Sequence, residues 1–322
     1  MSLCFVGDWA PVERHDYGFD GQLAIGNLEC AFSDDEVSNG KAYSSVLPMA
    51  CVDNIACAGF AALSVANNHA YDAGSKCLDS VLAELERRGV GYFGTREKPY
   101  ATLLDGGRKI AVIGCLEPCR SRGTRTFRQE DVLALVACIR KNFDSIYIYP
   151  HWGKEGEYTR YPSPMQRKLA RRWIDAGVDG VFGNHAHVPQ GMEEYKGKPI
   201  YYSIGNFDFP LGETDMYPAS RERMVVKVEV AGTTNHEFNS PVAENGFANV
   251  CSILDDEWSL LRWARYIGPV YLKKNMESWK LRLKKSFWKT LPKFLVWQSL
   301  PKTLLFRIVT LFGSQGVARV EG

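Results

Sequence analysis

The chain has 322 residues, of which 45% are hydrophobic and 12% aromatic, and this composition excludes a wholly disordered protein. Its 39 Lys and Arg and 37 Asp and Glu leave a net charge of +2, which argues against a dedicated nucleic-acid-binding protein. The charge is unevenly distributed. Residues 262–307 contain 12 basic side chains and one acidic side chain, so this stretch carries +11 and the rest of the chain carries −9.

The first two thirds of the chain alternate short apolar runs with helical patterns, which is typical of an α/β protein. Buried strands are predicted at residues 3–7, 23–28, 63–66, 109–115, 145–150, 178–183 and 199–204. Helices are predicted at residues 75–88, 130–142 and 165–176, and a glycine follows the first and the last of them as a stop signal. Residues 223–231 and 247–254 have no helix between them and predict antiparallel strands.

Five polar clusters follow or close predicted strands and contain four of the six histidines. They are Gly7-Asp8, Asn27-Leu28-Glu29, Asn67-Asn68-His69, His151-Trp152-Gly153 and His185-Ala186-His187. Taken singly, each cluster has an ordinary explanation as a turn, a helix cap or a hydrogen-bonded loop. Because the carboxyl ends of parallel strands meet at one rim, we expect six of these side chains to converge: Asp8, Glu29, Asn68, His151, His185 and His187.

The expected ligands are carboxylates, imidazoles and one amide oxygen, a mixture that suits Mn²⁺, Fe or Zn²⁺. Six ligands are too many for one tetrahedral site. A pair of divalent metal ions bridged by a carboxylate accommodates them, and we predict such a pair.

In chain order, these clusters resemble the CapA family of capsule and poly-γ-glutamate biosynthesis proteins, which belongs to the calcineurin-like metallophosphoesterase superfamily. Further matching residues are Asp72, Gly74, Glu155, Gln166 and the stretches 175–179 and 202–207. The resemblance covers residues 1–210. It implies an α/β fold of the αββα sandwich type, which we place at residues 1–256.

The resemblance implies that Asp8 and His187 hold one metal ion, that Asn68, His151 and His185 hold the other, and that Glu29 bridges them. It further implies phosphoester hydrolysis by a hydroxide between the ions. In this reaction His69 would be the general acid or a phosphate-orienting group, and Asp72 would fix its tautomer. Other residues are predicted to contact the substrate: Asn27, Asn67, Glu155, Asn206, Arg120 and Arg122. For Asn206 the alternative is a supporting contact to a metal ligand. Two positions depart from the superfamily pattern, which has a histidine where this chain has Ala10 and an aspartate where it has Glu29.

The basic residues after the fifth predicted strand and the overall activity each have alternative interpretations. Arg120 and Arg122, together with Arg125 and Arg128, would hold an anionic polymer or a phosphorylated substrate, or they form a solvated basic loop. The protein would be a phosphoester hydrolase, a metal-binding but non-catalytic accessory protein of an envelope-polymer synthesis complex, or an amide hydrolase or transferase acting on a polyglutamate chain.

Residues 257–322 are predicted to form a basic, Trp-rich helical extension, with an amphipathic helix at 278–291. Such a helix suits the surface of an anionic membrane, and the alternative is that it packs on the catalytic domain or a partner. No signal peptide or bilayer-spanning segment is recognised, so we expect a cytoplasmic protein with no nucleic-acid partner. If the extension binds a membrane, the protein would be peripheral on the inner membrane face.

Overall fold

The structure is a computed structural model of the chain. It describes residues 2–19, 21–37, 44–118, 125–153, 157–210, 218–229, 234–238, 241–254, 259 and 262–263. The chain divides into two units, Met1–Glu257 and Trp258–Gly322. The predicted helix at 278–291 lies outside the described residues, as do Arg120, Arg122 and Glu155. The membrane role of the 257–322 extension therefore stays a prediction.

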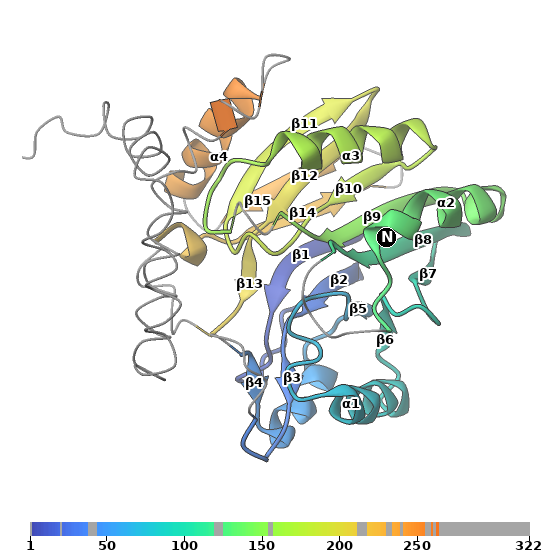
Figure 1. The fold of residues 1–322 in the computed structure, drawn as a ribbon, viewed down its shortest axis with the longest axis vertical. Coiled ribbons are helices and arrows are strands. Elements are labelled where there is room, and N and C mark those ends of the chain that lie inside the picture. Colours follow the sequence, from blue (N-terminus) through green and yellow to red (C-terminus); the bar gives the residue numbers. More distant parts are fainter. Residues whose placement is uncertain are drawn as a thin grey trace, which may run out of the picture. The chain divides into compact units, whose positions relative to one another are not determined.

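The first sheet has a parallel centre and an antiparallel edge (Figure 1). In spatial order its strands are β15 (Thr234–Phe238), β14 (Met224–Val228), β1 (Leu3–Trp9), β2 (Leu23–Leu28), β5 (Ala62–Ser64) and β6 (Gly91–Phe93), and β13 (Asn206–Asp208) also pairs with β1. Strands β1, β2, β5 and β6 run parallel to one another. Strand β14 runs antiparallel to β1, which confirms the antiparallel strand predicted at 223–231.

The second sheet has four parallel strands between two antiparallel edge strands. In spatial order its strands are β11 (Pro189–Tyr195), β12 (Lys198–Ile204), β10 (Gly180–Phe182), β9 (Ser145–His151), β8 (Arg108–Leu116) and β7 (Tyr100–Asp105). The four inner strands were predicted from their apolar runs. The edge strands β7 and β11 were not predicted, because both contain several polar residues.

The two sheets pack face to face, and this packing explains the apolar run at the start of β1. Leu3 and Phe5 belong to the core between the sheets, whereas Cys4 and Val6 belong to the core on the outer face of the first sheet. Phe5 stacks on Phe182 of the second sheet with ring centroids 4.1 Å apart. A strand that is buried on both faces has no polar side to present, so it reads as a continuous apolar run.

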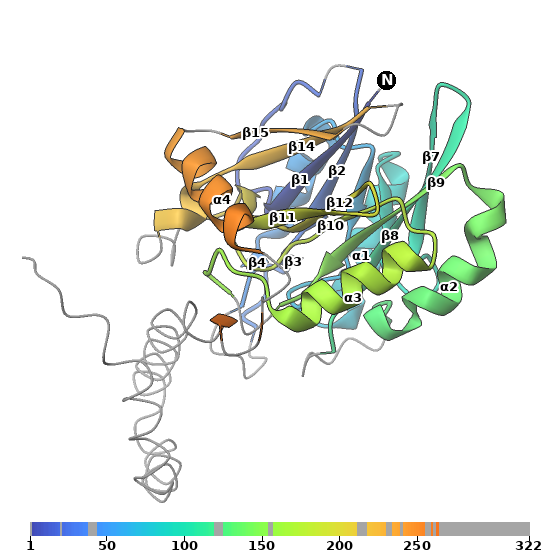
Figure 2. The same ribbon diagram turned by 90° about the horizontal axis from the view of Figure 1, so that it is seen from above.

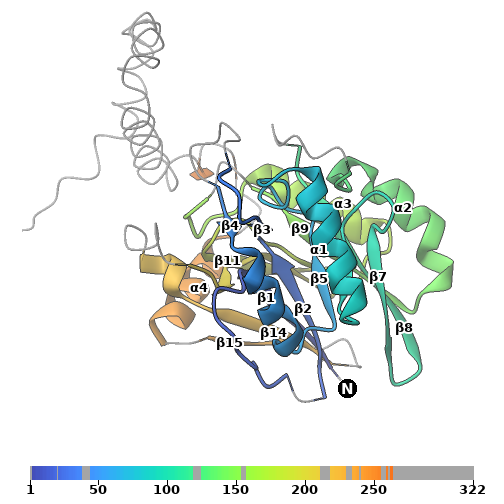
Figure 3. The same ribbon diagram turned by 90° about the horizontal axis from the view of Figure 1, so that it is seen from below.

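Helices cover the outer faces of both sheets. α1 (Ser75–Arg87) lies with the 3₁₀ helix η1 (Met49–Cys57) on the first sheet (Figure 3). α2 (Val132–Ile139) and α3 (Pro164–Asp175) lie on the outer side of the second sheet (Figure 2). The order helices, sheet, sheet, helices confirms the predicted αββα sandwich.

Helix α3 shows how local signals fix the ends of an element. The Ser163 hydroxyl accepts a hydrogen bond from the backbone N–H of Gln166, whose side-chain oxygen accepts one from the Ser163 N–H, and Pro164 occupies the first helical position. Trp173 of this helix stacks on Trp152 of the sheet with centroids 5.3 Å apart.

The strand predicted at 247–254 is wrong, because this stretch belongs to a helix, α4 (Pro241–Ile253), that contacts β11 and β15. Phe247, Val250 and Leu254 are buried, while Ala248, Asn249 and Ser252 are exposed. Apolar residues three and four positions apart share one face of a helix, and a strand would require alternation.

The remaining elements are β3 (Ala31–Phe32), β4 (Val46–Leu47) and the 3₁₀ helices η2 (Gln129–Asp131), η3 (Arg140–Asn142) and η6 (Pro218–Arg221). Among the residues that the structure describes, no helix is both long and apolar enough to span a bilayer.

Candidate metal centre

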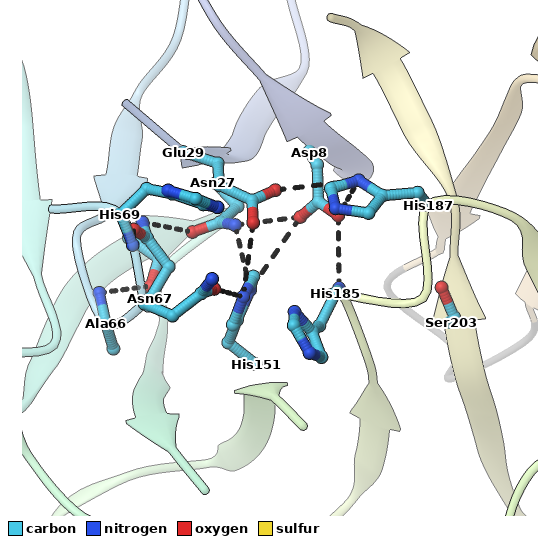
Figure 4. Close-up of polar contacts among 12 residues, drawn as sticks. Asp8, Asn27, Glu29, Ala66, Asn67, His69, His151, His185, His187 and Ser203 are labelled. Atoms are coloured by element: carbon cyan, nitrogen blue, oxygen red, sulfur yellow. Dashed lines mark hydrogen bonds and ion pairs between the residues drawn. The ribbon is translucent and has the colours of Figure 1, made fainter. Parts of the chain in front are cut away.

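Polar side chains from both sheets meet at the carboxyl ends of their parallel strands (Figure 4). Asp8 lies near the end of β1 and Glu29 directly follows β2, whereas His151 ends β9 and His185 and His187 follow β10. The rim that brings these groups together is therefore formed by two facing sheets. Strand order within one sheet does not explain the convergence.

A close backbone approach fixes the position of Asp8. A Cβ atom on Gly7 would lie 1.8 Å from the carbonyl oxygen of Gly205, so no larger residue fits at position 7 without displacing one chain segment. The N–H of Asp8 donates to that same carbonyl oxygen (2.9 Å). The absence of a side chain at Gly7 thus lets β1 lie against the β12–β13 connection and places Asp8 beside Asn206.

Glu29 lies between two histidines. Its Oε1 is 3.3 Å from Nε2 of His151, and its Oε2 is 3.9 Å from Nδ1 of His187. Asp8 makes a similar pair of contacts, with Oδ2 3.5 Å from His187 Nδ1 and Oδ1 3.9 Å from His151 Nδ1. Both carboxylates are fully buried.

Two overlapping groups of side chains could each hold a metal ion, because the ligand atoms within each group all lie within 4.8 Å of one another. One consists of Asp8, Glu29 and His151, and the other of Glu29, His185 and His187. Glu29 is common to both groups, which is the position that a bridging ligand occupies. The resemblance pairs Asp8 with His187, and their 3.5 Å separation is compatible with that assignment too.

The two histidines after β10 have unusual backbone conformations. The φ angle is 91° at His185 and 58° at His187, a region that residues other than glycine rarely occupy. Each such residue costs on the order of 1–3 kcal/mol and persists only where the surroundings enforce it. One such constraint is visible, because Asp8 Oδ2 accepts a hydrogen bond from the backbone N–H of His185 (3.1 Å).

Burial dominates the electrostatics of the site. It raises the pKa of Asp8, and His187 and the hydrogen bond from Asn27 oppose this effect. Burial also holds the pKa of His151 well below its usual value, and the neighbouring histidines act in the same direction. At neutral pH His151 is therefore an uncharged imidazole, the form that binds metals.

The donor set fits divalent metal ions. Buried carboxylates are unfavourable unless a cation or hydrogen bonds compensate their charge. Imidazole nitrogens beside carboxylate oxygens, without thiolates, are typical ligands of Zn²⁺, Fe and Mn²⁺. The residues predicted to bind metal thus lie where a divalent ion would be stabilised.

Asn68 and His69 border the same cluster. The side-chain oxygen of Asn68 lies 2.5 Å from His151 Nε2. The Asp72 carboxylate accepts a hydrogen bond from His69 Nδ1 (2.6 Å) and another from the backbone N–H of Ser45 (2.9 Å). The ring of His69 is therefore held in place through its Nδ1.

Three asparagines that were predicted to contact substrate bind other protein groups. Asn27 and Asn67 are 1% and 0% exposed, and their amides bond to Asp8, to each other and to the backbone. The Asn206 amide oxygen bonds to His187 Nδ1 (2.9 Å), and its nitrogen donates to the carbonyl oxygen of Ser220 (3.1 Å). This arrangement favours positioning roles for the three amides over the predicted substrate contacts.

Of the basic residues after β8, Arg125 and Arg128 are described. Arg125 forms ion pairs with Asp79 and Glu97, so part of its charge is already neutralised by the protein. This favours a structural role for Arg125 over the predicted contact with an anionic substrate.

Glu157 and Tyr158 were not predicted, although they lie against two of the predicted metal ligands. Glu157 Oε2 is 4.0 Å from His185 Nε2, and the Tyr158 ring stacks on His187 with centroids 5.3 Å apart. The available signal was a Glu-Tyr pair two residues beyond the predicted Glu155. Only the folded loop reveals that Glu157 lies beside a ligand histidine.

The fold and the cluster together define an α/β sandwich with a candidate divalent-metal centre at the carboxyl ends of its strands. Residues 16–210 match the family described as "Bacterial capsule synthesis protein PGA_cap". This match spans more than half of the chain, and the chain therefore belongs to that family.

Named relatives agree with this membership. The capsule biosynthesis protein CapA of Bacillus anthracis is 33% identical over 174 residues, which are 49% of this chain and 42% of that protein. The PGA biosynthesis protein CapA of Bacillus subtilis (strain 168) is 32% identical over 169 residues, 48% of this chain and 44% of that protein. In both cases the match spans less than half of the relative's length.

Among solved structures, a hypothetical protein from Thermus thermophilus aligns with a TM-score of 0.48 and 18% sequence identity. The alignment covers 74% of this chain and 98% of that protein.

Proposed function

We propose that this chain is a metal-dependent phosphoester hydrolase that acts in the synthesis of a capsule or poly-γ-glutamate polymer. The observation that carries the proposal is the position of Glu29. One of its oxygens faces His151 and the other faces His187, with Asp8 beside both histidines. A carboxylate between two sets of histidines is well placed to bridge two neighbouring divalent ions.

Six residues would hold these two ions: Asp8, Glu29, Asn68, His151, His185 and His187. When bound, the ions would stabilise negative charge on phosphoryl oxygens and make a water molecule more acidic. The oxygen and nitrogen ligands favour Mn²⁺, Fe or Zn²⁺ over Ca²⁺.

The chain's own residues supply the proton transfer. His69 donates a proton to the leaving oxygen, and the Asp72 carboxylate holds the ring by its Nδ1 hydrogen (2.6 Å) and stabilises the protonated form. The backbone N–H of Ser45 holds Asp72 in turn (2.9 Å). Tyr158 and Glu157 border the histidines that would bind metal.

The names of the relatives support the proposed polymer. They are called capsule biosynthesis and PGA biosynthesis proteins, and the family description refers to capsule synthesis. We extend this role to the present chain, with an anionic polymer or its phosphorylated precursor as substrate and an envelope-polymer synthesis complex as partner.

Metal content and hydrolysis test the proposal together. The purified protein should contain divalent metal by elemental analysis and should hydrolyse a generic phosphodiester or phosphomonoester. Asp8→Ala combined with His187→Ala should abolish both. Activity that survives in this double variant would refute the metal-dependent mechanism.

The same assay separates the alternatives. Shortened chains after incubation with poly-γ-glutamate would indicate amide chemistry. Stoichiometric metal without hydrolysis of any of these substrates would indicate an accessory binding protein.

A further inference from the structure

Asn67 and Asn27 connect the loop that carries His69 to the metal ligands. Both residues follow or lie near the end of strands of the first sheet, and their side chains are almost fully buried. An amide can accept at its oxygen and donate at its nitrogen, so its orientation decides which group each neighbour meets.

The backbone fixes the orientation of the Asn67 amide. Its oxygen accepts hydrogen bonds from the N–H groups of His69 (3.0 Å) and Ala70 (2.8 Å), which closes the turn that carries His69. Its nitrogen donates to the carbonyl oxygen of Leu28 (2.8 Å). If the amide were reversed, its nitrogen would face the N–H groups of His69 and Ala70, and its oxygen would face the carbonyl oxygen of Leu28. Only the observed orientation is therefore compatible with these partners.

The Asn67 amide in turn fixes that of Asn27. Its nitrogen also donates to the Asn27 side-chain oxygen (3.1 Å), so the Asn27 nitrogen must point the other way. That nitrogen lies 2.8 Å from Asp8 Oδ1 and 3.2 Å from His151 Nδ1. Asp8 belongs to the first sheet and His151 to the second, so the Asn27 amide lies between one predicted ligand from each sheet.

We infer that Asn67 is a positioning residue that acts through Asn27, turning the Asn27 amide so that it donates to Asp8 and holds this carboxylate as a metal ligand. This inference rests on the proposed metal site. It assigns the two asparagines to the positioning of ligands and gives them no contact with substrate.

Asn67→Ser is the most direct test. A serine hydroxyl can still accept from the turn that carries His69, but it is too short to reach Asn27, and the substitution introduces no charge. We expect affinity for Mn²⁺ and Zn²⁺, measured by calorimetry, to fall about 10- to 100-fold, as is typical for residues that support metal ligands. Asn54→Ser is the matched control. The Asn54 amide donates to the carbonyl oxygen of Pro11 (2.9 Å) and lies outside the hydrogen-bond relay from Asn67 through Asn27 to Asp8. Its metal affinity should stay within about twofold of the wild type.

A double-mutant cycle tests the route of action. If Asn67 acts through Asn27, Asn67→Ser should have almost no further effect on metal affinity in an Asn27→Ala background. Equal losses in both backgrounds would overturn the inference. If Asn67→Ser fails to fold, Asn27→Ser serves as the second variant, and wild-type metal affinity in Asn27→Ser would equally overturn it.

A metal-free measurement separates this inference from the proposed function. In protein labelled with ¹⁵N at asparagine, Asn27→Ser identifies the side-chain N–H₂ signals of Asn27. These signals should shift and lose their slow hydrogen exchange in Asn67→Ser. Unchanged signals would refute the relay, whereas a relay that is present in a protein without metal affinity would refute the proposed function alone.

Discussion

Replacing Asp72 by asparagine tests whether the His69–Asp72 pair works as a proton donor. One carboxylate oxygen, Oδ2, accepts from both His69 Nδ1 and the backbone N–H of Ser45, and the residue is 1% exposed. The asparagine oxygen can occupy the same position and accept the same two hydrogen bonds. The substitution therefore removes the negative charge and leaves the geometry in place.

The size of the effect follows from the loss of that charge. A hydrogen bond to a charged group contributes about 1.5–3 kcal/mol, against about 0.5–1.5 kcal/mol between neutral groups. The variant thus loses about 1–1.5 kcal/mol of the stabilisation of protonated His69. At about 1.4 kcal/mol per factor of ten, kcat/KM falls roughly five- to tenfold.

The assay compares two phosphate esters that differ in their leaving group. An alkyl phosphate needs a proton on its leaving oxygen and should show the full five- to tenfold loss, whereas p-nitrophenyl phosphate, with a good leaving group, should lose less than about twofold. Asp175→Asn is the control, since Asp175 pairs with Lys196 at the surface (2.5 Å). An equal loss for both esters, or no loss for either, would refute the assignment of His69 as general acid.

Three further predictions concern the metal, the core and the cysteines. Mn²⁺ or Zn²⁺ at about 100 times its Kd should stabilise the wild type by about 2.7 kcal/mol, which raises Tm by roughly 5–10 °C, and a chelator should reverse the shift. The Tm of Asp8→Ala should rise far less, and an equal rise would place the metal elsewhere. Phe5→Ala should lower the free energy of unfolding, measured in urea, by about 3–5 kcal/mol, because Phe5 is fully buried and stacked on Phe182. A loss below about 1 kcal/mol would contradict the packing between the sheets. Burial raises the pKa of Cys4 to about 11, so at pH 8 little thiolate is present and iodoacetamide should modify exposed Cys138 before Cys4. Alkylation of Cys4 in the native protein at a rate equal to that of Cys138 would contradict its burial.

Local sequence signals identified most of the elements that build the site. The apolar run of β1 has no polar side, and the glycines that follow α1 and α3 lie within two residues of the helix ends that they mark. Such signals act over one or two turns of chain, so they can be recognised without knowing what the element packs against. The stretch 247–254 shows the limit of this reasoning. Its apolar residues suit a strand by composition, and only their spacing on the buried face of α4 reveals the helix.

The sequence by itself determined which residue types stand at the ends of which strands, and therefore that carboxylates and imidazoles are available for a metal. Tertiary structure decided what those groups do, because their contacts join residues that are far apart in the chain. The contact of Asp8 with His187 joins two sheets, and the burial of Asn27 between Asp8 and His151 turns an expected substrate contact into a support for ligands. Hydrogen-bond direction and burial depend on neighbours that are distant in sequence, and no local pattern records them.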